Sequence, residues 1–331
     1  MPITLAEAKV GMTNKVNQQV VDTFRRSSLL LDRMTFDNML SPGTGGSTLG
    51  YTYVQLKTPS TAGVRQINTE YTANEAKREE KSTKAIIMGG SFQVDRVIQN
   101  TSGAVDEMAF QMEQKIKATA NQFHNNVING TSASSGAGYV PNTFDGLKKM
   151  LTGTSSELSS GIDISDANAI GSNAYAFLDQ LDALVAAVDG DVSMLMMNGD
   201  MLLKVKSVAR RAGYYSRQED AFGRTVEYYG NIPLVDLGKY YNGTKSVDVV
   251  DTSAASSSTL GKTSIYAVSL GLDGFFGISP TGTGVIQTFL PDMTAPGAVK
   301  TGEVELVAGV ALRNTLKAAV LTDIGIKPKS A

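Results

Sequence analysis

The chain contains no cysteine and no tryptophan, and His124 is its single histidine. Disulfide bonds, thiolate catalysis and the usual cysteine- and histidine-rich zinc and iron–sulfur sites are therefore excluded. We accordingly expect no cofactor, no metal and no enzymatic activity. The enzyme hypothesis that survives relies on serine and carboxylate groups alone, and a saturable activity abolished by one Ser or Asp substitution would establish it.

An excess of charge of one sign is also missing. Thirty Lys and Arg residues oppose 32 Asp and Glu residues, so the formal net charge is −2. No global field would then draw the chain to nucleic acid or to a membrane. Long apolar runs and a secretion signal are missing from the sequence too. We expect a soluble intracellular protein, and a hydrophobic content of 42% is enough for the cores of about two domains.

The strongest local pattern predicts an amphipathic helix over residues 103–128. Its apolar side chains recur at spacings of three and four residues, and they are Val105, Met108, Ala109, Met112, Ile116, Ala120, Phe123 and Val127. At about 1.5 Å per residue such a helix is roughly 40 Å long, which spans a small domain. We expect the apolar stripe to be buried, and His124 to lie on the helix surface or at an interface rather than to act in catalysis.

Residues 49–57 alternate as a strand does, and we expect them to pair with residues 84–98. The polar connection between these strands is long and carries charges of both signs, which favours a projecting arm over a buried loop. Candidates for contacts between subunits are Arg65, Glu75, Lys77, Arg78, Glu79, Glu80 and Lys81. The usual alternative for such a charge run is a solvated surface.

The second half of the chain alternates helix and strand patterns. The helix predicted over residues 200–212 carries Lys204, Lys206, Arg210 and Arg211, which form either a basic patch for phosphate groups or a solvated helix face. Residues 304–320 keep a period of two over some 50 Å, longer than strands usually run, so we expect a bend or turn near Arg313 and Asn314. Residues 260–263 resemble the end of a phosphate-binding loop, but a strand pattern follows where that loop needs a helix.

The order of these elements resembles the major capsid protein of tailed bacteriophages. The segments that carry the resemblance are residues 89–96 as the return strand, 129–131 with 144–147 as the turn after the spine helix, 196–200 with the basic helix and residues 223–233, and the closing strands 299–321. The resemblance implies an α+β fold of known plan. Its parts are an N-terminal arm (1–46), an extended-loop hairpin (47–98), a peripheral domain (99–160 plus 298–331) with spine helix 103–128, and an axial α/β domain (161–297).

The function that the resemblance implies is a subunit that assembles as hexamers and pentamers into an icosahedral shell around double-stranded DNA. The shell would belong to the virion and be assembled in the host bacterial cytoplasm, without a membrane. A portal protein and a separate scaffolding protein are implied partners, DNA would be contacted non-specifically, and the basic helix would supply an inner-surface or capsomer patch. One alternative is an encapsulin-like nanocompartment, which a co-purifying enzyme would favour; another is a β-rich surface-layer or adhesin protein, which requires an export signal.

Overall fold

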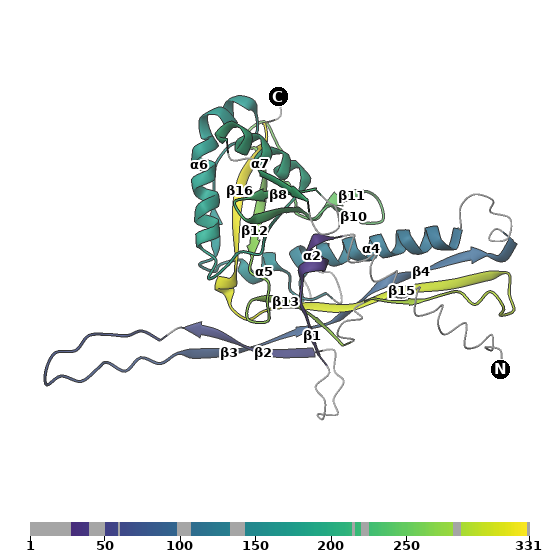
Figure 1. Cartoon of the computed structure of the whole chain (residues 1–331), viewed down its shortest axis with the longest axis horizontal. Coiled ribbons are helices and arrows are strands. Elements are labelled where there is room, and N and C mark those ends of the chain that lie inside the picture. Colours follow the sequence, from purple (N-terminus) through teal and green to yellow (C-terminus); the bar gives the residue numbers. More distant parts are fainter. Residues whose placement is uncertain are drawn as a thin grey trace.

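A computed structural model of the chain describes residues 28–39, 50–58, 60–97, 107–132, 143–213, 216–219, 225–280 and 286–329. In Figure 1 a long helix lies along an elongated sheet, a part with helices and a second sheet stands above one end of it, and a narrow two-stranded ribbon projects away from both. Within these ranges no helix is both long and apolar enough to cross a membrane.

The elongated sheet is built around β15 (Val299–Leu312), which is antiparallel to all of its neighbours. Along one edge β15 pairs with β4 (Ile86–Asp95), and along the other it pairs first with β14 (Ile286–Phe289) and then with β13 (Phe275–Ser279). A short strand from the amino-terminal part, β1 (Phe36–Asn38), adds to β13 in parallel. Every second residue of β4 and β15 is buried, so one face of the sheet forms the main core.

The spine helix that covers this face is α4 (Glu107–Asn129), and its existence confirms the prediction, although residues 98–106 at the expected start lie outside the described ranges. As expected, four positions of the stripe are buried, namely Ile116, Ala120, Phe123 and Val127. Toward the amino-terminal end of α4 the prediction of burial is wrong, because Ala109 is exposed and Met108 and Met112 are only partly buried. Met108 and Met112 still pack against the main core, so the first turns of α4 bury part of the expected stripe.

The second sheet has seven strands in the described residues, in the order β5-β16-β12-β6-β9-β8-β7. Their bounds are β5 (Glu157–Ser159), β16 (Ala318–Lys327), β12 (Gly261–Val268), β6 (Met194–Met197), β9 (Ile232–Asp236), β8 (Thr225–Tyr229) and β7 (Ser216–Glu219). The pairs β5–β16 and β6–β9 are parallel and the others are antiparallel. The helices α6 (Ala167–Ala186) and α7 (Gly199–Ala212) pack on this sheet and enclose a second core.

Small elements join the two sheets. They are α2 (Leu29–Arg33), α5 (Leu147–Leu151), the hairpin of β10 (Lys239–Tyr241) with β11 (Ser246–Asp248), and the 3-10 turn η1 (Thr315–Lys317). The predicted turn near Arg313 and Asn314 is confirmed, because η1 separates β15 from β16. The two closing strands belong to different sheets, although the expected boundaries grouped them in one domain. Residues 318–321 are buried as a continuous run, which suits a central strand of the second sheet.

The helices α6 and α7 each begin with a residue whose side chain caps the first turn, and one of these caps is exposed whereas the other is buried. Asp166, which is exposed, accepts hydrogen bonds from the backbone N–H groups of Asn168 and Ala169, each at 2.8 Å. Asn198 is 1% exposed, and its Oδ1 accepts a 2.8 Å bond from the N–H of Met201. The Asn198 amide nitrogen also donates to the Val250 carbonyl at 2.9 Å, and lies near two threonine hydroxyls. Asn198 therefore ties the start of α7 to the chain around residue 250.

Replacing Asn198 with alanine is expected to lower the free energy of unfolding by about 3 kcal/mol, because a buried N–H and a buried carbonyl lose their partner along with the cap. The matched control is Asp166→Ala, which removes an exposed cap and should cost about 1 kcal/mol. Chemical denaturation of the free subunit measures both values. Equal losses in the two variants would show that the buried amide contributes nothing beyond capping.

Candidate assembly surface

The projecting ribbon consists of β2 (Gly50–Thr58) and β3 (Lys77–Lys84), paired antiparallel with Tyr53 opposite Lys81. The expected strand over residues 49–57 is thereby confirmed, but its expected pairing with residues 84–98 is wrong. Those residues mostly form β4, whose alternate apolar side chains are buried under α4. Most of the charged residues assigned to the connection instead form the returning strand of the ribbon, because a segment that is polar on both faces has no apolar side to pack under α4.

The root of the ribbon is fixed to the body by specific hydrogen bonds. The amide of Gln55 donates to the Leu312 carbonyl, and the hydroxyl of Thr83 donates to the Val310 carbonyl, each at 3.0 Å. The phenol of Tyr51 donates to Asp37 at 2.7 Å and accepts from Arg313 at 3.2 Å. Burial, together with the hydrogen bond to Asp37, raises the pKa of Tyr51. These contacts hold the ribbon at a set angle to β15.

The outer part of the ribbon makes few contacts with its own chain. Residues 60–76 are exposed throughout; Val64 is fully exposed, and Ile67 and Tyr71 are 89% and 64% exposed. Arg65 lies 5.3 Å from the centre of the Tyr71 ring and donates a hydrogen bond to the Thr69 carbonyl. A loop this long with exposed apolar side chains and no core of its own is typical of a binding element.

The ribbon also presents a mixed apolar and charged face. Val54 and Leu56 are exposed on one side of β2, and they lie opposite Glu80 and Arg78 in the register. The structure thus brings most of the predicted contact residues together on β3, namely Lys77, Arg78, Glu79, Glu80 and Lys81, with Arg65 and Glu75 in the loop. Lys81 and Glu79 lie together on the other face of the ribbon, where they form a 3.1 Å ion pair. The sequence predicted these positions; it did not show that they share one strand.

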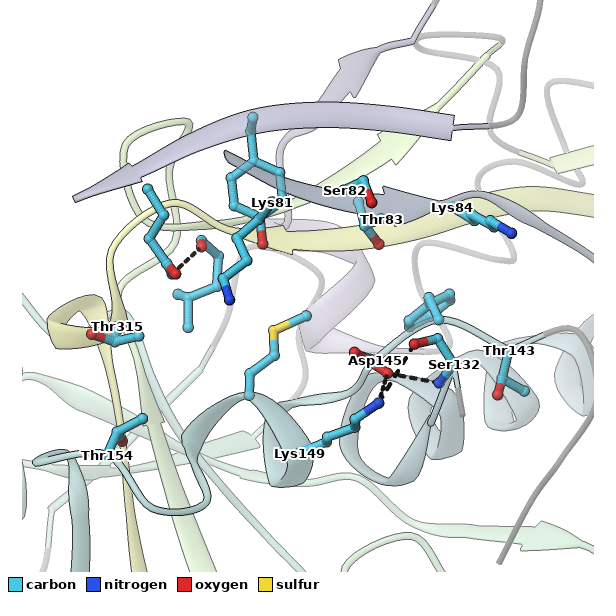
Figure 2. Close-up of a pocket in the computed structure, with 15 residues that line it drawn as sticks. Lys81, Ser82, Thr83, Lys84, Ser132, Thr143, Asp145, Lys149, Thr154 and Thr315 are labelled. Carbon is cyan, nitrogen blue, oxygen red and sulfur yellow. Dashed lines mark hydrogen bonds and ion pairs between the residues drawn. The ribbon is translucent and has the colours of Figure 1, made fainter. Parts of the chain in front are cut away.

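A cleft of about 570 Å³ opens between the root of the ribbon and α5. Lys81 and Lys149 point toward it from opposite walls, as Figure 2 shows. Asp145 forms a 2.8 Å ion pair with Lys149 and accepts a 2.6 Å hydrogen bond from the N–H of Ser132. Burial alone would raise the pKa of Asp145, but these partners hold it below its ordinary value. The cleft is lined by polar and apolar groups together, and in the described residues no set of three or more His, Asp or Glu side chains is placed to hold a metal ion.

The basic residues of α7 do not face one way as a free patch. Lys204 donates to the Ser165 carbonyl and Arg211 to the Ala167 carbonyl, so both bind the chain at the start of α6. Lys206 forms a 2.7 Å ion pair with Glu227. Arg210 is exposed, and its Nε lies 3.4 Å from the Lys206 carbonyl. Most of these cations therefore bind groups of their own chain and do not form a free patch.

A long helix laid along an elongated sheet, an α/β part at one end and a projecting ribbon together define the fold, and solved structures of an encapsulin and of a phage capsid share it. The chain is 14% identical to the SrpI encapsulin of Synechococcus elongatus PCC 7942, with a TM-score of 0.56 and coverage of 91% of this chain and 89% of that chain. It is 15% identical to a chain of the capsid of Myoviridae phage XM1 (TM-score 0.51; coverage 89% and 91%). It is 11% identical to a chain of Mycobacterium phage Bobi (TM-score 0.53; coverage 89% and 90%). At such identities the likeness establishes the fold.

The family follows from the sequence itself. A family model described as SU10 major capsid protein matches residues 11–269, and the chain belongs to that family. A search of curated proteins finds no match. The chain is therefore a structural protein of a tailed-phage capsid that self-assembles into the shell, and the resemblance and fold class predicted from its sequence are confirmed.

Proposed function

We propose that the chain assembles as hexamers and pentamers into an icosahedral shell around double-stranded DNA, in the cytoplasm of a bacterial host. The observation that carries this proposal is the contrast within the ribbon: its root is hydrogen-bonded to β15, whereas residues 60–76 are exposed. An isolated two-stranded ribbon is marginally stable in water. A second copy of the chain would supply the missing contacts.

The charges of β3 suit repeated contact between identical subunits. Arg78 and Glu80 flank the exposed Val54 and Leu56, so the same face offers both signs of charge around an apolar centre. Complementary charges of this kind fix the register of an interface more than its strength. Heterologous contacts between copies close into rings when the rotation between them is right, as hexamers and pentamers require.

The division of the chain and its other partners are part of the same proposal. We expect the chain to divide as the family plan does, into an arm (1–46), an extended loop, a peripheral domain with α4 and an axial domain. Because β4 belongs to the elongated sheet and β16 to the seven-stranded sheet, we place β4 in the peripheral domain and β16 in the axial domain. A portal protein and a separate scaffolding protein would direct closure. Packaged DNA would be contacted weakly, with Arg210 and Arg211 as the exposed cations of the basic helix.

A protein nanocompartment is the second candidate, and the structural match to an encapsulin favours it. Negative-stain electron microscopy of the chain, expressed alone and with the neighbouring reading frames, separates the hypotheses. Rings of five or six subunits and closed uniform shells that contain DNA or a portal are expected for the phage capsid. Shells that hold an enzyme instead would support the compartment, and monomers in both preparations would contradict the proposal.

A further inference from the structure

His124 lies where three parts of the molecule meet. Contrary to the expected surface or interface position, it is 5% exposed inside the subunit, on the buried side of α4. Its Nε2 is 2.7 Å from the hydroxyl of Ser28, and its Nδ1 is 3.3 Å from the carbonyl of Leu237, which follows β9 of the seven-stranded sheet. Ser28 is in turn the N-cap of α2 and accepts a hydrogen bond from the N–H of Leu31.

These partners define one protonation state of the ring. The Leu237 carbonyl can only accept, so Nδ1 carries the proton and donates to it. Nε2 is then a bare acceptor, to which the Ser28 hydroxyl donates. The neutral ring thus satisfies both partners. Burial lowers the pKa of His124 from 6.5 to about 4, while the hydrogen bond to Leu237 acts in the opposite direction.

No carboxylate contacts the ring in the described structure, although charged groups lie around it. The cleft of about 310 Å³ that exposes Ser28 and His124 is also lined by Lys206 of α7, Glu227 of β8 and Asp236 of β9, and the first two of these form an ion pair with each other. On the other packed elements, α2 carries Asp32, and β10 carries Lys239, which pairs with Asp248. A charged imidazole would therefore be poorly compensated where it stands.

We propose that His124 is a proton-operated latch that holds α2 to the spine helix and to the seven-stranded sheet, and that protonation of its ring releases α2. The latch goes beyond shell formation, and it can be tested in the free subunit. An imidazolium gains solvation if one wall of the cleft moves away from it. Of the three parts, α2 is the smallest: it is a five-residue helix with Ser28 as its N-cap and its three leucines buried. Leu237, by contrast, is fixed through its N–H to the Met197 carbonyl at 3.1 Å.

The direction of the pH effect follows from the lowered pKa. Above pH 6.5 the ring is neutral in both the closed and the open state, so the closed state has its full stability. As the pH falls from 6.5 to about 4, only the open state binds the proton, and closure weakens progressively. A separation of 2.5 between these values corresponds to a shift of up to about 300-fold in the closing equilibrium.

Hydrogen exchange and NMR of the free subunit test the latch. Protection factors of the α2 amides, corrected for intrinsic exchange, should fall by about 100-fold or more between pH 7 and pH 4 while those of central α4 amides hold. Because His124 is the single histidine, its imidazole resonance reports the titration without assignment, and it should titrate below pH 5. The variant His124→Gln, which cannot titrate, should keep α2 protected at pH 4.

Two further variants separate the latch from general acid unfolding. Ser28→Ala removes the contact itself, so α2 should exchange fast even at pH 7. Asp236→Asn removes a carboxylate of the same cleft and should keep the wild-type pH profile. The proposal is overturned if the imidazole titrates near pH 6.5, or if α2 stays protected at pH 4 in the wild-type chain. An unchanged pH profile in His124→Gln would also overturn it, and should that variant fail to fold, the wild-type resonance and Ser28→Ala still decide.

Discussion

Subunits in which an Asn-Gly turn replaces residues 59–76 are expected to fold normally and to form no closed shells. Thr58 and Lys77 are paired at the end of the ribbon, so a two-residue turn joins β2 to β3 without disturbing the root. The removed loop is exposed, and its loss should change the melting temperature little. Electron microscopy and analytical ultracentrifugation would show single subunits or small oligomers in place of shells, a loss of assembly of at least 100-fold in yield.

A matched variant distinguishes the length of the loop from its chemistry. A Gly-Ser linker of equal length keeps the reach but removes Val64, Ile67 and Tyr71, so it should also prevent closure. Normal shells from the Gly-Ser variant would mean that contact side chains lie elsewhere. Normal shells from the shortened chain would contradict the assembly role of the outer ribbon altogether.

The variant Gly130→Ala is expected to destabilise the subunit by more than about 3 kcal/mol, enough to prevent soluble expression. A Cβ atom at Gly130 would lie 2.4 Å from the carbonyl oxygens of both Asn126 and Phe144. Both are backbone atoms, and the Gly130 N–H already binds the Asn126 carbonyl at 3.0 Å, so neither oxygen can move aside without breaking the end of α4.

The control for Gly130 is the same change at an open position. Gly153 has a positive φ of 76° and no atom within 4 Å of an added Cβ, so Gly153→Ala should cost only the backbone strain of about 1 kcal/mol. Urea denaturation of both variants measures the difference. Similar values for the two would show that the turn after α4 adapts to a side chain.

Periodicity predicted the elements whose burial repeats regularly. The apolar spacing around Phe123 and the alternation of residues 304–307 each reflect one face packed against a core, whereas residues 308–312 are buried on both faces; both the helix and the strand are present. The resemblance to the capsid family predicted how these elements are arranged along the fold. Pairing was not predictable in the same way: the segment opposite β2 was missed because β3 is charged on both faces and carries no alternation.

The chemistry of single side chains was the least predictable part. Lys204 and Arg211 have the composition of a basic patch, and only the fold shows that carbonyl groups of another helix lie within their reach. For His124 the neighbours Phe123 and Val127 on the same buried stripe were a usable signal, but the decisive partners, Ser28 and Leu237, are remote in sequence. The cleft beside Lys149 likewise exists only once the ribbon root is docked.

The exposure of residues 60–76 in the free subunit affects how readily a wrongly placed subunit can dissociate from a growing shell. Exposed side chains lose rotamer freedom when a neighbouring subunit covers them, so each new contact is weaker than its buried area alone would suggest. A subunit added at a wrong angle would then leave quickly, since most differences in affinity are differences in the rate of departure. Error correction during growth would thus follow from the exposure of residues 60–76 in the free subunit.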